Sequence, residues 1–206
     1  MGRIIDKIHA RRRQHSYGTA SENNKNNERL RYYSFEFFPP KTEAGLDNLL
    51  TRIDRMSNRL DPLFIDVTWG DSGCTWARTM AVASHAQRYC GVDVLLHLTC
   101  VGMTREQLSQ ALSQAKRCGI SNILALRGDP PRGKLPQGWQ PDDISGGECD
   151  RAIDLVRLIR KLHGNYFGIA IAGHPGVYQY FLFHFFVAPL FSLKHSLMTK
   201  ILFLHL

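Results

Sequence analysis

Polar side chains with catalytic potential recur along this sequence at intervals that suit a repeated structural unit. Glu36, Thr68, His97 and Asp129 are separated by 32, 29 and 32 residues, and His174 follows the next apolar run. Carboxyl, hydroxyl and imidazole groups can donate, accept and relay protons, so this set suits general acid–base chemistry. Each residue lies in or just after a short apolar run, which predicts that all five meet at one end of a parallel sheet.

Glu36 is the residue with the strongest claim to a chemical role. It lies among Phe35, Phe37 and Phe38, in a strand that we expect to be buried on both faces. Burial disfavours the charged form of a carboxyl, which would keep Glu36 protonated near neutral pH, as a general acid requires. The alternative is a structural glutamate paired with an arginine such as Arg127.

Two further segments leave more than one interpretation. His97, within the apolar run LLHL (95–98), is either a hydrogen-bonded core imidazole or a ligand contact. The stretch RGDPP (127–131) places a charge pair at the end of a strand, where Gly128 allows close approach to the backbone. The alternative, an adhesion ligand on an exposed loop, is disfavoured because the apolar strand at 123–126 places the triplet at the edge of the core.

The elements that must position these residues alternate between strand and helix patterns. Apolar runs predict five strands, at 33–38, 63–69, 94–100, 122–127 and 167–172. Apolar residues at helical spacing lie between them, with a predicted cap at Thr42 for the first helix. Its apolar positions are Leu46, Leu49, Leu50, Ile53 and Met56.

Two later helices also have readable ends or faces. TREQ (104–107) fits a capping box, and Gly119 is the predicted stop. The buried stripe of this helix is Leu108, Leu112 and Ala115, and the apolar face predicted for the last helix is Ala152, Ile153, Val156, Ile159 and Leu162. The strand–helix alternation predicts an α/β fold whose catalytic groups gather at the mouth of a (β/α)₈ barrel.

The two ends of the chain differ from this middle part. Residues 1–31 hold eight Lys or Arg against three acidic residues, more than half of the net charge of +8, and we expect a solvated basic tail with a short helix over 1–13. Because the charge excess is local, a nucleic-acid-binding module is disfavoured. Residues 177–206 form an atypical hydrophobic tail, which Gln179, His184 and Pro189 interrupt too often to favour a membrane span. A non-native ending is the preferred interpretation.

Five cysteines occur, and none forms a C-x-x-C pair, so the sequence predicts neither a metal site nor a dithiol centre. Reduced thiols in a cytoplasmic protein are the expectation.

Five motifs resemble, in order and spacing, the catalytic domain of eukaryotic methylenetetrahydrofolate reductases. They are SFEFFPPK (34–41), DVTWG (66–70), HLTC (97–100), ALRGDP (125–130) and YFGIAIAG (166–173). The resemblance runs from about Tyr32 to Pro175 and implies a TIM-barrel domain over 32–176 with about five of its eight βα units.

The resemblance implies reduction of 5,10-methylenetetrahydrofolate to 5-methyltetrahydrofolate, in one-carbon and methionine metabolism, with FAD as cofactor and NADPH or NADH as reductant. Glu36 matches the family's proton donor to folate N10, and Asp129 matches a carboxylate beside the flavin. The matching flavin-contacting positions are Thr68, Trp69, His97, Arg127, Gly128, Asp129, Arg151, Ala152 and His174. The positions that match nicotinamide or substrate contacts are Glu36, Phe37, Phe38, Pro39, Pro40 and Lys41.

Departures from the family weaken the expectation of activity. His174 stands where the family usually has Tyr, and Arg151 where members often have Tyr. The last three βα units and the regulatory domain have no counterpart, so the alternative is an inactive truncated isoform or fragment that binds a partner. The resemblance implies a folate substrate and a possible homo-oligomer in the full-length form, with neither nucleic acid nor a membrane as partner.

Overall fold

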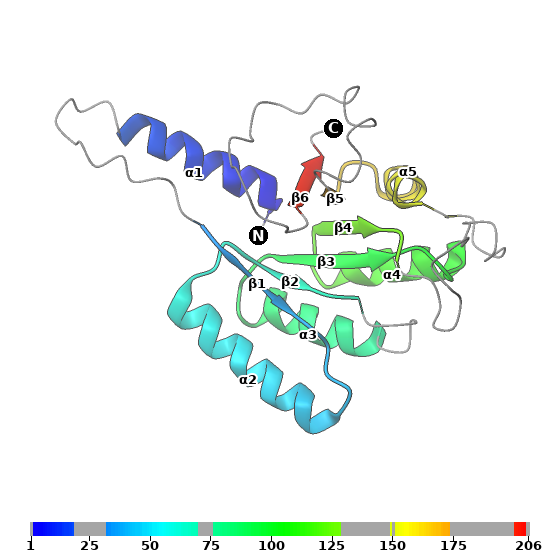
Figure 1. Cartoon of the computed structure of the whole chain (residues 1–206), viewed down its shortest axis with the longest axis horizontal. Helices are drawn as coiled ribbons and strands as arrows, with labels where there is room; N and C mark the ends of the chain where they lie inside the picture. Colours follow the sequence, from blue (N-terminus) through cyan, green and yellow to red (C-terminus); the bar gives the residue numbers. More distant parts are fainter. Residues whose placement is uncertain are drawn as a thin grey trace.

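The computed structural model describes residues 2–18, 32–69, 76–128, 149, 151–173 and 200–204. Within these ranges the strands form one six-stranded sheet in the order β1-β2-β3-β4-β5-β6 (Figure 1). The strands are β1 Ser34–Phe37, β2 Phe64–Val67, β3 Val94–Thr99, β4 Asn122–Leu126, β5 Gly168–Gly173 and β6 Lys200–Leu204. The helices are α1 Ile4–Gly18, α2 Glu43–Leu60, α3 Trp76–Arg88, α4 Arg105–Arg117 and α5 Ala152–His163.

The first five strands pair in parallel, which confirms the five predicted strands and an α/β fold consistent with an incomplete barrel. The middle strands are rich in Val, Ile and Leu, as expected where both faces of a parallel sheet are covered. All four residues of β2 and the first five of β3 are buried.

Alternating residues divide the sheet into two faces. Ile65, Leu96 and Ile123 belong to the large core beneath α2–α5, whereas Phe64 and Leu95 belong to a second core on the opposite side. In a (β/α)₈ barrel the helices lie outside, so the opposite side corresponds to the barrel interior. We call it the inner face. The same alternation places Glu36, Asp66 and His97 on it.

Local sequence signals account for the ends of two helices. The Thr42 side chain accepts a hydrogen bond from the Gly45 amide at 3.1 Å and so caps α2. The capping box of α4 is present, since Gln107 N donates to Thr104 Oγ1 and Thr104 N donates to Gln107 Oε1. Gly119, just past the end of α4, has a φ of +80°, a conformation that favours glycine. These predictions are confirmed.

The predicted apolar face of α5 is partly wrong. Leu155, Val156, Leu158 and Ile159 are the buried residues of this helix, while Ile153 and Leu162 are exposed. The buried residues still follow helical spacing, but the buried side is rotated so that Leu155 and Leu158 take the place of Ile153 and Leu162. Packing of α5 on β4 selects the observed face.

The prediction of a solvated N-terminal tail is wrong for the part of 1–31 that the structure describes. Ile4 and Ile8 of α1 are buried against the inner-face residues Phe64, Leu95 and Leu124. Figure 1 shows α1 on the opposite side of the sheet from α2 and α3. The predicted helix therefore exists, but it covers apolar surface on the inner face that would otherwise meet water.

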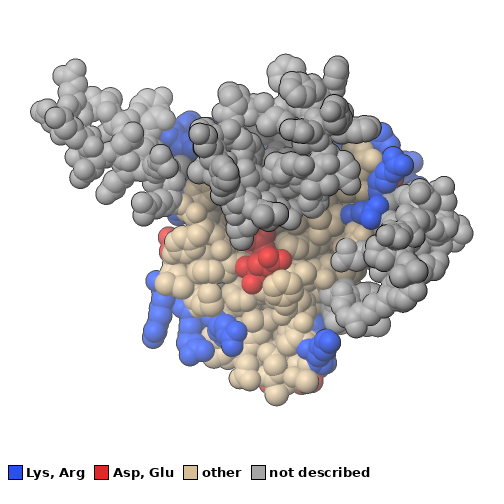
Figure 2. Space-filling model, viewed as in Figure 1, with Lys and Arg blue, Asp and Glu red and all other residues tan. Residues whose placement is uncertain are grey.

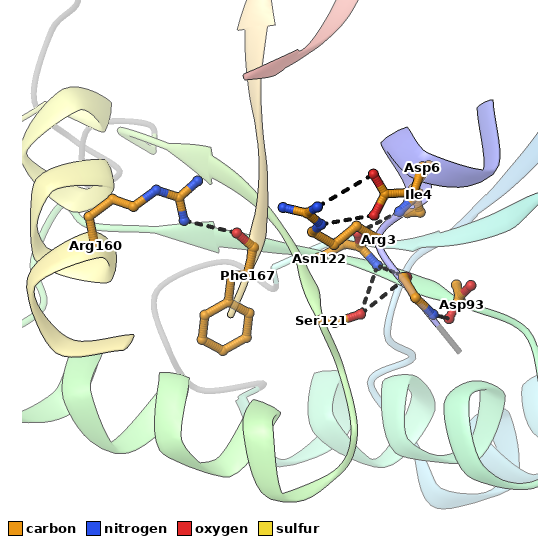
Figure 3. Close-up of polar contacts among 9 residues, drawn as sticks. Arg3, Ile4, Asp6, Asp93, Ser121, Asn122, Arg160 and Phe167 are labelled. Atoms are coloured by element: carbon orange, nitrogen blue, oxygen red, sulfur yellow. Dashed lines mark hydrogen bonds and ion pairs between the residues drawn. The ribbon is translucent and has the colours of Figure 1, made fainter. Parts of the chain in front are cut away.

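Polar contacts hold the start of α1 in place (Figure 3). The Ile4 amide donates to Asn122 Oδ1 at 2.8 Å, the Gly2 amide donates to Asp93 Oδ1 at 3.3 Å, and Lys7 Nζ lies 2.5 Å from Asp93 Oδ2. Asn122 and Asp93 are fully buried, so α1 supplies the partners that these polar side chains need. Residues 19–31 lie outside the described part, and the domain boundary at 31 stays a prediction.

The strand β6 was not predicted. It pairs antiparallel with β5, with Ile169 opposite Leu204 and Gly173 opposite Lys200. Of the hydrophobic tail, residues 177–199 lie outside the described residues. Within the described residues, none of the helices is both long and apolar enough to cross a membrane.

Candidate functional site

Four polar side chains from neighbouring strands come together at the carboxyl ends of β1 to β3. Glu36 lies opposite Asp66 in the register of β1 and β2. Thr68 Oγ1 donates a hydrogen bond to Glu36 Oε1 at 3.0 Å. The imidazole of His97 lies between the two carboxyls, with Nδ1 3.9 Å from Glu36 Oε1 and Nε2 3.6 Å from Asp66 Oδ1. The predicted convergence of Glu36, Thr68 and His97 is confirmed by these distances.

Burial divides the cluster into an open and a closed half. The side chain of Glu36 is 48% exposed, whereas those of His97 and Asp66 are 8% and 5% exposed. The prediction that Glu36 is buried on both faces is therefore wrong. β1 is an edge strand of the described sheet, so Glu36 has a neighbouring strand on one side only. β3, by contrast, lies between β2 and β4. The desolvation argument for the protonated state of Glu36 does not apply.

Asp66 is the site residue that sequence reasoning missed. Its Oδ1 and the Nε2 of His97 are both buried, and neither atom makes a hydrogen bond within the described residues, although the two lie 3.6 Å apart. Burying two polar atoms without partners is costly, and a proton on His97 Nε2 directed at Asp66 would offset part of that cost. The sequence did contain a signal for Asp66, namely an acidic residue at an inward-facing position of the apolar strand FIDV (64–67).

Gly128 confirms the predicted close approach at the end of β4. Its φ is +95°, and a Cβ at this position would lie 3.0 Å from Thr99 Cβ. The preceding carbonyl, of Arg127, accepts hydrogen bonds from the amides of Cys100 and Val101 at 3.2 and 2.9 Å. The ends of β3 and β4 are thus held together with glycine-only space between them.

The side chains of the segment predicted to contact nicotinamide and substrate differ in how exposed they are. Phe37 is buried in the core beneath the helices, so only its backbone is available to a ligand on the inner face. Phe38 is 67% exposed. Lys41 is exposed as well, and Pro39 and Pro40 are partly buried. Arg78 donates to the Pro40 carbonyl at 3.2 Å and pairs with Glu43, which fixes the segment that leads into α2.

The described contacts do not bring the remaining predicted flavin-contacting residues to Glu36, Thr68 and His97. Trp69 packs on Trp76 with ring centroids 4.8 Å apart, at the margin of the core beneath the helices. Arg151 is exposed at the start of α5, where its amide donates to Asp154 Oδ2 at 3.2 Å, and Ala152 is partly buried. Asp129 and His174 lie outside the described residues.

The charges visible in the view of Figure 2 are unevenly placed. Lys and Arg side chains lie mainly toward the edge of the described surface, and acidic atoms lie near its centre. We call Glu36, Asp66, Thr68 and His97 the inner-face cluster. It combines the half-exposed carboxyl of Glu36 and the hydroxyl of Thr68 with a buried imidazole that has an unsatisfied nitrogen. Gly128, at the end of β4, adds backbone without a side chain in the way. This donor set fits a planar, polar heterocycle such as a flavin, and a proton donor beside it.

Comparisons with known proteins place this chain in a family. The family model described as methylenetetrahydrofolate reductase matches residues 22–196, which extends past Pro175, where we expected the resemblance to end. A rice protein named "Probable methylenetetrahydrofolate reductase (NADH)" is 48% identical over 146 residues, 69% of this chain and 23% of that protein. Arabidopsis thaliana "Methylenetetrahydrofolate reductase (NADH) 1" is 47% identical over the same shares of each chain.

A more distant relative carries a different reductant in its name. The Caenorhabditis elegans "Probable methylenetetrahydrofolate reductase (NADPH)" is 39% identical over 153 residues, 72% of this chain and 22% of that protein. The chain therefore spans roughly a quarter of the length of these curated relatives. The family resemblance seen in the five motifs is confirmed.

Proposed function

Because this chain belongs to the methylenetetrahydrofolate reductase family, we propose that it carries the first part of a site that reduces 5,10-methylenetetrahydrofolate to 5-methyltetrahydrofolate. The observation that supports this most directly is the half-exposed Glu36 carboxyl on the inner face, held by Thr68 and adjoining His97. An acid that must protonate a substrate has to be reachable from the open side of the site, and Glu36 is.

Glu36 is the proposed proton donor to folate N10. The Thr68 hydroxyl engages Oε1, which leaves Oε2 to carry the proton toward a substrate. Protonation at N10 favours opening of the five-membered ring to a cationic iminium, the species that accepts a hydride. The proposed role of Asp129 is to attract that cation by its negative charge.

His97 and Asp66 are proposed to position Glu36. With its proton on Nε2 and directed at Asp66, His97 presents the lone pair of Nδ1 toward Glu36. Asp66 touches neither substrate nor cofactor in this scheme and acts through His97.

FAD is the proposed cofactor, and it supplies the hydride when it is bound. The residues proposed to hold it are Thr68, Trp69, His97, Arg127, Gly128, Asp129, Arg151, Ala152 and His174. Thr68 and His97 offer polar groups on the inner face, and Gly128 offers backbone without a side chain. NADPH or NADH is the proposed reductant, and the exposed ring of Phe38 is suited to stack on a nicotinamide.

The decisive experiment separates the two half-reactions. In a chimera that joins this chain after Gly173 to the corresponding downstream part of the Arabidopsis relative, Glu36→Gln should slow folate reduction by at least about 100-fold, as expected for loss of a general acid. Flavin reduction by NADPH or NADH should be retained. Asp61→Asn is the control, because this carboxyl is 95% exposed and follows the far end of α2, away from the segment 36–41. Equal loss of both half-reactions in Glu36→Gln would assign Glu36 a structural role.

The chain by itself is a different test. We expect the 206-residue protein to retain less than stoichiometric FAD after gel filtration, because the described sheet leaves β1 unpaired on one side and the barrel open. A yellow, stoichiometric complex bleached by NADPH or NADH would show a working flavin site in this chain alone. A colourless protein that joins another chain through the β1 edge would favour the second candidate function, a non-catalytic fragment that binds a partner.

A further inference from the structure

We propose that Asp54, His85 and Cys90 form a binding site for a divalent transition metal, Zn²⁺ in the first instance, between α2 and α3. The site lies on the helical layer and shares no residue with the inner-face cluster. It does not depend on the proposed reductase function.

The three side chains converge on one point. His85 Nε2 lies 2.7 Å from Asp54 Oδ1, and Cys90 Sγ lies 3.1 Å from the same oxygen. One ligand atom from each residue falls within 4.8 Å of the other two. Among the described residues, no other three His, Cys, Asp or Glu side chains meet in this way.

The three ligands lie on α2, on α3 and in the turn that follows α3. Asp54 comes from the middle of α2, which packs beside α3, and His85 comes from the last turn of α3. Cys90 follows the end of α3, in a turn held by hydrogen bonds from the amides of Tyr89 and Cys90 to the His85 carbonyl at 2.9 and 3.3 Å. The ring of Tyr89 lies against that of His85, with centroids 5.4 Å apart, and restricts its orientation.

The donor set suits Zn²⁺. One imidazole nitrogen, one sulfur and one carboxylate oxygen form a borderline-soft group of the kind that zinc accepts in tetrahedral geometry. Side-chain exposures of 21% for His85 and 47% for Asp54 leave room for a water as the fourth ligand. The sequence did not suggest this site, because its ligands come from two helices and include no C-x-x-C pair.

Metal binding must displace the proton that Cys90 carries. Burial, followed by the hydrogen bond to Asp54, raises the pKa of Cys90 to about 12, so without metal the residue is a thiol. Hydrogen bonds from Cys90 and His85 lower the pKa of Asp54, which is ionised. Zn²⁺ binding would form Zn–S, Zn–N and Zn–O bonds, break the S–H bond with release of one proton to solvent, and move the ring proton of His85 from Nε2 to Nδ1. Affinity should therefore increase with pH.

The experiment uses Co²⁺ as a spectroscopic substitute for Zn²⁺ on the full chain. We expect a saturable 1:1 complex with a sulfur-to-cobalt charge-transfer band, tetrahedral visible bands, release of one proton per cobalt in weak buffer, and displacement by Zn²⁺. Cys90→Ser and His85→Gln should each weaken binding by more than about 100-fold, since even changes to groups that only hydrogen-bond a metal ligand cost 10–100-fold. Cys118→Ser is the matched control, because Cys118 is also a partly buried free thiol.

Three results would overturn the proposal: no charge-transfer band at millimolar Co²⁺, an unchanged band in Cys90→Ser, or loss of the band in Cys118→Ser. Any of these leaves Asp54, His85 and Cys90 as a hydrogen-bonded cluster that joins α2 to α3. Circular dichroism checks that each variant is folded. If Cys90→Ser does not fold, hydrogen exchange of the unsubstituted chain decides, because bound Zn²⁺ should slow exchange in 85–92 and leave 105–117 unchanged.

Discussion

At the residue scale, the inner-face cluster separates an accessible acid from a closed pair that supports it. Glu36 is half-exposed and hydrogen-bonded to Thr68, whereas His97 and Asp66 are buried and face each other. A reactive group needs access, while the groups that orient it gain from exclusion of water, because electrostatic interactions strengthen where water is absent. The geometry therefore suits Glu36 for proton transfer and Asp66 for orienting the imidazole.

Asp66→Asn tests whether Asp66 sets the tautomer of His97. An amide no longer offers a charged acceptor to Nε2, so we expect the ring proton to distribute between Nδ1 and Nε2. Ring ¹⁵N chemical shifts of His97 in the full chain measure this directly. Asp61→Asn is the control, because the Asp61 side chain is 95% exposed. Unchanged His97 shifts in Asp66→Asn would remove the proposed positioning role.

Cys90 offers a pH prediction whose sign follows from its raised pKa. The folded value of about 12 exceeds the ordinary 9.0, so the native state holds the thiol proton more tightly than the unfolded chain does. The stabilisation from this residue is present below pH 9.0 and is lost as pH rises toward about 12. In metal-free buffer at pH 8, alkylation of native Cys90 should be at least about 10-fold slower than in the unfolded chain, because the thiolate is the nucleophile.

The measurement is mass spectrometry of Cys90-containing peptides after timed iodoacetamide treatment. Asp54→Ala removes a hydrogen bond and a negative charge that both raise the pKa of Cys90, and it should speed the reaction. Equal rates in native and unfolded protein would show that Cys90 is not held as a protonated thiol.

At the scale of elements, α1 is the part whose role differs most from the expectation. Its basic residues suggested a solvated segment, yet one side of the helix closes part of the inner face. Lys7 pairs with the buried Asp93, and Asn122 exchanges hydrogen bonds with Gly2 and Ile4. The start of the helix therefore provides partners for buried polar groups in addition to its apolar contacts. A helix with these contacts is part of the folding unit.

Ile4→Ala and Ile5→Ala compare two neighbouring positions of the same helix. Ile4 is fully buried and Ile5 only partly so. Ile4→Ala should lower the free energy of unfolding by about 2–4 kcal/mol, as for large-to-small changes in a core. Ile5→Ala should cost less than about 1 kcal/mol, because less apolar surface is lost. Urea denaturation followed by circular dichroism measures both, and equal costs would contradict docking of α1.

At the scale of the whole molecule, the described sheet has a strand order and helix layer consistent with a barrel that is not closed. β1 to β5 follow in sequence order with α2 to α5 on one side, and β6 pairs with the far edge of β5. An unpaired strand edge exposes amide and carbonyl groups that can pair with another molecule. β6 therefore protects one edge of an open sheet.

Replacement of 200–204 by Gly and Ser residues tests this protective role at constant chain length. We expect the variant to form soluble aggregates at lower concentration than the unsubstituted chain, because β5 loses its outer partner. Light scattering over a concentration series provides the measurement. A variant that stays as monodisperse as the unsubstituted chain would show that β6 contributes nothing to edge protection.

The sequence by itself determined the five parallel strands, the helix caps at Thr42 and Thr104, the stop at Gly119, the family, and the gathering of Glu36, Thr68 and His97. These depend on side-chain periodicity, on bonds between residues three or four apart and on motif order, all of which are legible along the chain. The tertiary structure alone decided the rest: the docking of α1, the face that α5 buries, the exposure of Glu36, the pairing of Asp66 with His97, and the meeting of Asp54 with His85 and Cys90. Each of these features depends on which elements of the fold cover one another. Such packing joins residues that are far apart in sequence, and no local pattern encodes it.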